Sequence, residues 1–455
     1  MQVSNFVYYT LKQKVLGPPI TNYAGIREWC TNGQAITPKG EFPTEPHRPF
    51  VVDFEINVNE RVPQNSFFRL TISTPFLLSL AKNTTHLLAD ATFKIFSQGF
   101  RVILTGTTDT RRKFHPFTLS VTTFDNQGDF GFVFNSLKNV LSIFFSFVYS
   151  PNCLLADAAG AIELGATDAF GNAFVRLMCW AHVRTNIEKN MKIKNKEYAS
   201  GLMTDIYDLQ LSFNQVCFDF LYRLFREKWF KLKDDDVKHF LEYFHNQWVE
   251  TQPLWFEGAS PHLPSTTNGL ESVNGVIKKI HTDFERLSLG EGLSVLTKMF
   301  QNWSINRERN EDKFDPTLEI SDEAWEHGHI AAKKWMLTNI AGSDRYLVCH
   351  PDNRESLSEF DRYFVKNLSR VSIEFNAASS LLRTIFLVTL KRDDWSFSTC
   401  TCLSFHKVYM CSHIIGVAIH QKLCFVPRNI VEKQEITTLA KRGRKKKATP
   451  ALSRI

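Results

Sequence analysis

The chain reads LLADATFKI over residues 87–95 and, further on, CLLAD over residues 153–157. Each is a short apolar run that contains a single acid, Asp90 in the first and Asp157 in the second. Runs of this length and composition predict buried strands. A carboxylate in or beside a buried strand is costly unless it has a partner. The two runs therefore predict two buried strands, and their acids point to a site.

The segments around these two runs predict an ordered series of strands and helices. Two more strands are expected at residues 100–105 and 117–122, a helix at 128–149, an Ala-rich helix at 158–170 and a strand at 174–179. The order is strand, strand, strand, helix, strand, helix, strand. A hairpin meander that leads into an α/β alternation is the order that a ribonuclease-H-like fold needs.

The whole chain is predicted to be an α/β protein: a ribonuclease-H-like core, with a mixed sheet flanked by helices, is interrupted by an all-helical insertion and followed by a small zinc-binding domain. The expected segments are a partly irregular lead-in (1–66), the first part of the core (67–182), the helical insertion (183–264), a helix with a third acid and further helices (265–345), a β-rich segment with the zinc module at 395–420 (346–430), and a basic tail predicted to be disordered (431–455). The most apolar stretch, residues 140–150, is too short to span a membrane, and no membrane association is expected.

The third acid, Glu271, lies at the predicted start of a helix within STTNGLESVN, residues 265–274. Divalent cations such as Mg²⁺ or Mn²⁺ prefer carboxylate oxygens, and a pair of them can activate an attacking oxygen and stabilise a leaving one. Taken singly, a strand-end Asp is usually a turn or cap residue, and a first-turn Glu often only complements the helix dipole. Asp90, Asp157 and Glu271 are more informative as an ordered set.

Four segments resemble the motifs of Mutator-like (MULE) DDE transposases: LADATFK at 88–94, LLADAAGAI at 154–162, CWAH at 179–182 and STTNGLESVN at 265–274. The resemblance implies a ribonuclease-H-like catalytic domain in which Asp90, Asp157 and Glu271 hold Mg²⁺ or Mn²⁺. It also implies cleavage of DNA at the terminal inverted repeats of a transposon and joining of the ends to target DNA. By family analogy, the chain is expected to act as a homo-oligomer on DNA.

Cys179 and His182 lie three residues apart in the CWAH motif. Two ligands do not complete a zinc site. The preferred interpretation is a supporting role beside the acids, or a contact to DNA phosphate, rather than a separate metal site.

A second group of candidate ligands lies near the end of the chain. Cys400 and Cys402, followed by Cys411 and His413, provide three thiols and one imidazole, which suit tetrahedral Zn²⁺. The first pair is expected on a tight strand or turn and the second at the start of an apolar helix. The pattern resembles the SWIM zinc finger, which often follows the catalytic core of Mutator-like transposases. We expect a structural zinc that folds residues 395–420.

The net charge of +7 is concentrated at the C-terminus. Residues 441–455 carry seven basic residues and no acid, so the rest of the chain sums to zero. The dense part of this run predicts nuclear localisation or contact with DNA phosphate; its members are Lys441, Arg442, Arg444, Lys445, Lys446 and Lys447. The odd count of nine Cys favours metal binding in a reducing compartment over a disulfide framework.

One feature of the resemblance is missing before the core. Relatives usually carry an additional zinc-based DNA-binding domain there, but only Cys30 and two His precede Asp90. The chain is therefore expected to be a fragment, to recognise DNA ends by other means, or no longer to transpose. The alternative function is that of a domesticated transposase, a non-catalytic DNA-binding regulator of transcription.

Overall fold

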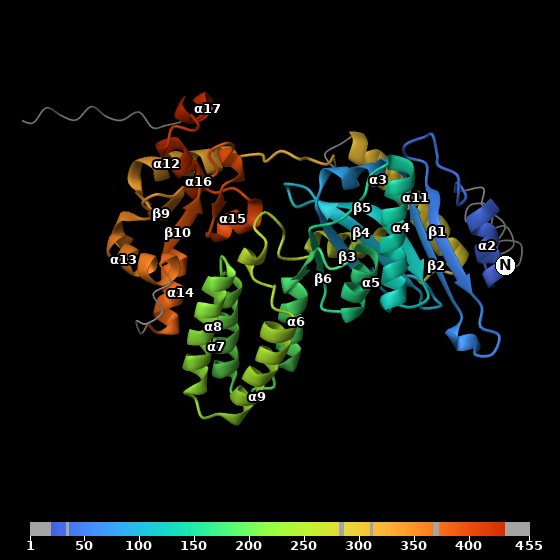
Figure 1. Cartoon of the computed structure of the whole chain (residues 1–455), viewed down its shortest axis with the longest axis horizontal. Helices are drawn as coiled ribbons and strands as arrows, with labels where there is room; N and C mark the ends of the chain where they lie inside the picture. The colour runs from blue at the N-terminus through green and yellow to red at the C-terminus, as the bar shows by residue number, and fades with distance from the viewer. Residues whose placement is uncertain (1–19, 33–35, 282–285, 310–312, 367–372, 433–455) are drawn as a thin grey trace, which may run out of the picture.

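The structure, a computed structural model, describes residues 20–32, 36–281, 286–309, 313–366 and 373–432. The basic run at 441–447 lies outside the described residues. Within them, no helix is both long and apolar enough to cross a bilayer. The described chain forms a seven-stranded sheet with covering helices, a block of helices, and a C-terminal part with a four-stranded sheet (Figure 1).

The larger sheet has the strand order β1-β2-β5-β4-β3-β6-β7. β3 pairs antiparallel with β4 and parallel with β6, and β6 pairs parallel with β7. The strands are β1 (Phe50–Asn57), β2 (Phe67–Ser73), β3 (His86–Thr92), β4 (Arg101–Thr108), β5 (Phe114–Thr122), β6 (Cys153–Ala156) and β7 (Val175–Met178). The five strands expected from the sequence are present, and β1 and β2 extend the sheet beyond β5. β1 lies in the segment that the sequence left as a partly irregular lead-in.

Helices cover both faces of this sheet. Their bounds are α2 (Tyr23–Asn32), α3 (Pro75–Ser79), α4 (Gln127–Phe145), α5 (Gly160–Phe170), α10 (Asn268–Val276) and α11 (Leu289–Arg309). α4 begins at a capping box in which Asn126 and Asp129 satisfy each other's backbone N–H groups. α4 and α5 pack closely because Gly165 has no side chain: a Cβ there would lie 2.6 Å from the backbone nitrogen of Gly131. Apolar residues of α10 and α11 complete the same core.

A block of helices lies in the sequence between the strands β3 and β6, which position the first two acids, and the helix α10, which carries the third. It consists of α6 (Trp180–Asn190), α7 (Lys196–Gln210), α8 (Gln215–Phe230) and α9 (Asp235–Phe244). Its core is aromatic, and Trp248 and Trp255 are almost fully buried in it. Figure 1 shows the block as a separate lobe beside β6. Residues 183–264, which were expected to be helical, contain most of α6 and all of α7, α8 and α9.

The C-terminal part contains a sheet of order β11-β10-β9-β8. Its strands are β8 (Met336–Asn339), β9 (Arg345–Cys349), β10 (Ile385–Thr389) and β11 (Thr399–Cys400), and its helices are α12 (Asp322–Lys334), α13 (Leu357–Phe360), α14 (Phe375–Thr384), α15 (Leu403–Val408), α16 (Ser412–His420) and α17 (Arg428–Glu432). Alternate residues of β9 point to opposite sides. Leu347 packs into the helical block and Val348 into the core of the zinc module.

The segment 346–430, which was expected to be β-rich, is in part helical. Leu357–Phe360 and Phe375–Thr384 form helices α13 and α14, and strand β10 begins only at Ile385. Phe375, Ala378 and Leu381 are buried at helical spacing and pack into the core of the helical block. Phe375–Thr384 contains one aromatic and one β-branched residue, and the helical spacing of its apolar residues is the signal that the sequence interpretation missed.

Candidate metal centres

The parallel pairing of β3 with β6 brings the first two acids together. Leu88 is the register partner of Leu155, so two residues further on Asp157 follows β6 beside Asp90 in β3. Asp90 is 9% exposed. Asp157 is half-buried, and its carboxylate accepts the backbone N–H of Ala159 at 2.9 Å, which fixes the turn into α5. Both carboxylates thus lie at the edge of the sheet where β3 and β6 end.

The third acid reaches the same edge from α10. Glu271 lies in the first turn of this helix, and its Oε1 is 3.6 Å from Nδ1 of His182 in α6. Ligand atoms of Asp90, Asp157 and His182 all lie within 4.8 Å of one another, and so do those of Cys179, His182 and Glu271. His182 belongs to both groups. The structure therefore brings the other four sequence-predicted residues, Asp90, Asp157, Cys179 and Glu271, around the imidazole ring of His182.

The electrostatics of this acidic cluster are those of crowded carboxylates. Burial raises the pKa of Asp90 to about 6; nearby His182 lowers this pKa, while the charges of Asp157 and Glu271 raise it. Interaction with the Cys179 thiol, then the charges of Glu271 and Asp90, raise the pKa of His182 to about 9 against the effect of burial. Crowded and partly buried carboxylates favour a bound cation.

Sequence reasoning did not single out two polar residues that support the acids. Asn274 is buried one helical turn after Glu271, and its amide donates to Oδ2 of Asp90 at 2.8 Å. Thr267 donates its hydroxyl to Oε1 of Glu271 at 3.1 Å. Asn274 and Thr267 lie within the quoted segment 265–274. The spacing of three residues between Glu271 and Asn274 is the signal that places Asn274 on the same helix face as Glu271.

Cys179 connects this helix start to β7. Its Sγ accepts the backbone N–H of Thr267 at 3.3 Å and lies 3.2 Å from the Thr267 hydroxyl, whose one proton it shares with Oε1 of Glu271. Burial raises the pKa of the Cys179 thiol, but His182 and the two donors of Thr267 outweigh burial and the net pKa is lowered. The side chain is fully buried, so it holds the chain in place beside the acids.

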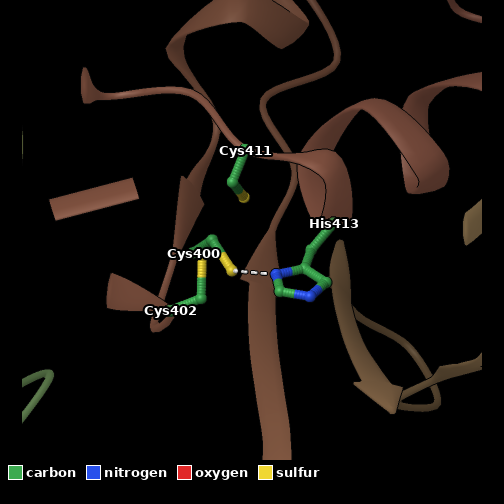
Figure 2. A group of neighbouring side chains, drawn as sticks. All are labelled: Cys400, Cys402, Cys411 and His413. Atoms are coloured by element: carbon green, nitrogen blue, oxygen red, sulfur yellow. Dashed lines mark hydrogen bonds between the residues drawn. The ribbon is translucent and has the colours of Figure 1, made fainter. Parts of the chain in front are cut away.

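The four C-terminal candidate ligands form a second cluster, which is drawn in Figure 2. Cys400 ends β11, Cys402 caps α15, and Cys411 and His413 lie at the start of α16. Their ligand atoms lie within 4.8 Å of one another, and Sγ of Cys400 is 3.7 Å from Nδ1 of His413. All four are buried. The ring of His413 stacks on Phe386, with 4.2 Å between the ring centroids.

The residues of this cluster fit a zinc ion. Ligand atoms about 2.3 Å from a tetrahedral zinc lie roughly 3.8 Å from one another, which matches the sulfur-to-nitrogen distance between Cys400 and His413. Burial raises the pKa of the Cys400 and Cys411 thiols, whereas hydrogen bonds from these two thiols lower the pKa of Cys402. Without a cation, three neighbouring buried thiols cannot all lose their protons, because the negative charges would repel one another. Bound Zn²⁺ stabilises all three as thiolates.

Comparison with protein families agrees with this second site. Residues 386–422 match the SWIM zinc finger family. The match includes all four ligands, and the SWIM-type zinc site predicted from the sequence is confirmed. No curated protein matches the chain.

Proposed function

We propose that the chain is a Mutator-like DDE transposase whose ribonuclease-H-like core cleaves transposon ends and joins them to target DNA. The sheet order supports the proposed fold, because five of its strands run β5-β4-β3-β6-β7 with β3, β6 and β7 parallel and β4 antiparallel to β3. The observation that carries the proposal is the convergence of Asp90 and Asp157 on His182, with Glu271 beside it.

The proposed site would hold Mg²⁺ or Mn²⁺ on Asp90, Asp157 and Glu271. Bound there, divalent ions activate the attacking oxygen and stabilise the charge on the leaving oxygen of a phosphodiester. The donor set fits such ions, because the three acids offer the oxygen ligands that hard cations prefer. Asn274 orients the Asp90 carboxylate through its 2.8 Å hydrogen bond, and Thr267 does the same for Glu271.

The basic run at 441–447 supports DNA as the partner and the nucleus as the compartment. A domesticated, non-catalytic DNA-binding regulator is the alternative, and it would use the same run. The two functions differ in one respect: the transposase needs the three acids to cleave DNA, whereas the regulator does not cleave DNA.

A nicking assay tests the proposal. The substrate is the genomic DNA on either side of the gene, where the proposal expects terminal inverted repeats, incubated with the full chain and Mn²⁺ or Mg²⁺. The proposal expects nicks with the wild type and background cleavage with Asp157→Ala. Asp352→Asn, which changes an acid on the exposed surface of the C-terminal part, is the matched control and keeps activity. Equal products from wild type and Asp157→Ala refute the enzyme and favour the regulator.

A further inference from the structure

A buried carboxylate outside the acidic cluster, Glu257, lies between the zinc module and the start of α10. Its side chain is 10% exposed. Oε1 accepts the Ser265 hydroxyl at 2.9 Å and the Gln210 amide at 2.7 Å, and Oε2 lies 3.7 Å from Nδ1 of His406. A buried acid is costly without such partners, so its contacts hold three segments of the chain together.

On the zinc side, Glu257 meets a helix that begins at a zinc ligand. His406 lies in α15, and Sγ of Cys402 caps this helix by accepting the backbone N–H of Phe405 at 3.4 Å. α15 is a short helix between the ligands Cys402 and Cys411. Because so short a helix is not stable alone, its position depends on the module that zinc folds.

On the acidic side, Ser265 and Thr267 fix the first turn of α10. The backbone oxygen of Ser265 accepts the N–H of Trp180 at 2.8 Å, and Thr267 donates its backbone N–H to Cys179 and shares its hydroxyl proton between Cys179 and Glu271. The backbone N–H of Glu271 then donates to the oxygen of Thr267 at 2.9 Å. A displacement of Ser265 is thereby passed to the turn that carries Glu271.

The turn between β4 and β5 makes a second connection across the same junction. The Arg112 guanidinium donates to the backbone oxygens of His406 at 2.8 Å and Lys407 at 3.1 Å, and it lies over the ring of Tyr409. The backbone oxygen of Arg112 also lies against Gly269 of α10, 3.4 Å from where a Cβ would be. Both connections join α15 to the same turn of α10.

We propose that Glu257 is a positioning residue through which the zinc module holds the third acid, Glu271, in place. Zinc then sets the affinity of the acidic cluster for Mn²⁺ or Mg²⁺, although its own site lies in another part of the chain. The effect on divalent metal rests on the proposed function, whereas the mechanical link between α15 and α10 does not.

The test compares the full-length wild type with Glu257→Ala and Glu257→Gln. The zinc content shows whether the zinc module is intact. Hydrogen exchange of residues 265–276 measures the stability of the start of α10, and Mn²⁺ titration measures the affinity of the acidic cluster. The proposal expects one zinc per chain throughout, about tenfold or faster exchange at the helix start and about tenfold weaker Mn²⁺ binding in Glu257→Ala. The control, Asp208→Asn, removes another buried acid of an ion pair, with Arg383, and leaves both readouts unchanged.

A double-mutant cycle with His406→Ala makes the test specific for the path. If Glu257 acts through α15, the double variant shifts exchange and Mn²⁺ affinity little more than either single variant. Wild-type exchange and affinity in Glu257→Ala overturn the proposal. If Glu257→Ala does not fold, Glu257→Gln decides the test, because Gln keeps an oxygen for Ser265 and removes the charge near His406. Unchanged exchange and Mn²⁺ affinity in Glu257→Gln then overturn the proposal. Failure of the wild type to bind Mn²⁺ refutes the proposed function instead, and the exchange measurement still decides the link.

Discussion

The zinc cluster and the acidic cluster, the two candidate metal centres, are built in opposite ways. The zinc ligands lie within fourteen residues, Cys400 to His413, and the turns between them are short. The acidic cluster draws its members from β3, the ends of β6 and β7, α6 and α10, so it exists only when the large sheet and the helical block are assembled. We therefore expect the first centre to hold its own part of the fold together, and the second to be held by the fold.

The largest expected effect is loss of the zinc module on removal of one ligand. Cys411→Ser should lower the zinc content from one per chain to near zero and unfold residues 386–422, because a structural zinc contributes on the order of 10 kcal/mol to such a module. Metal analysis and hydrogen exchange measure the two effects. Cys424→Ser is the control. Because Cys424 lies outside the cluster, this variant should keep one zinc per chain. One zinc per chain in Cys411→Ser would contradict the expectation that the four ligands hold the zinc and that the zinc holds this part of the fold.

The next expected effect is the loss of divalent metal without loss of fold. In Asp157→Asn, the new amide oxygen can still accept the N–H of Ala159, and one negative charge of the crowded cluster is gone. Its melting temperature without added metal should equal or slightly exceed that of the wild type. Saturating Mn²⁺ should stabilise only the wild type, by about 2.7 kcal/mol at a concentration of 100 Kd. A large drop in the metal-free melting temperature would show that Asp157 holds the fold after all.

A smaller effect is expected from the residue that orients the first acid. Asn274→Ala removes the donor to Asp90 and leaves a buried carboxylate oxygen without its partner, at a cost of about 1–3 kcal/mol. Mn²⁺ affinity should fall about tenfold, as on loss of other groups that orient metal ligands. Urea unfolding and Mn²⁺ titration measure these changes. Asn135→Ala removes a comparable amide from α4, where it donates to Gly131, and should leave Mn²⁺ affinity unchanged.

The same contrast explains what the sequence could and could not predict. The zinc ligands were predictable because their spacing is local, and their chemistry does not depend on distant packing. The strands around Asp90 and Asp157 were predictable from apolar runs, and the parallel pairing of Leu88 with Leu155 then brings the two acids together. Glu271 was informative only as part of an ordered set and through the resemblance, because no local pattern shows where a helix docks after a long helical segment.

Residues whose role depends on assembly were missed. Glu257 has an ordinary sequence context, and only the docking of α15 gives it His406 as a neighbour. β1 pairs with β2 at the edge of the sheet, although its own sequence, FVVDFEIN, follows a Pro-rich stretch that indicated irregular structure. Helix α14 lies in the segment that was expected to be β-rich, and the face that it buries against the helical block is defined by a partner far away in the chain.

The smallest expected effect concerns His86, on the same strand as Asp90 but at its other end. Thr108 donates its backbone N–H to Nε2 at 3.3 Å, and burial lowers the pKa of His86 from 6.5 to about 4. Between these two pH values the unfolded chain takes up a proton that the folded chain does not, so stability falls as the pH drops from 6.5 to 4 and is constant above this window. The loss should be about 1–3 kcal/mol, the lower part of that range being favoured by the partial exposure of the ring.

His86→Gln isolates this contribution, because its amide oxygen can accept from Thr108 without titrating. The difference in melting temperature between wild type and variant should shrink as the pH falls from 6.5 to 4, while zinc content and Mn²⁺ affinity at neutral pH stay the same. A constant difference would show that His86 is not held neutral by the fold. A change in Mn²⁺ affinity would show instead that β3 transmits strain along its length to Asp90, and that the acidic cluster depends on more of the sheet than the edge where β3 and β6 end.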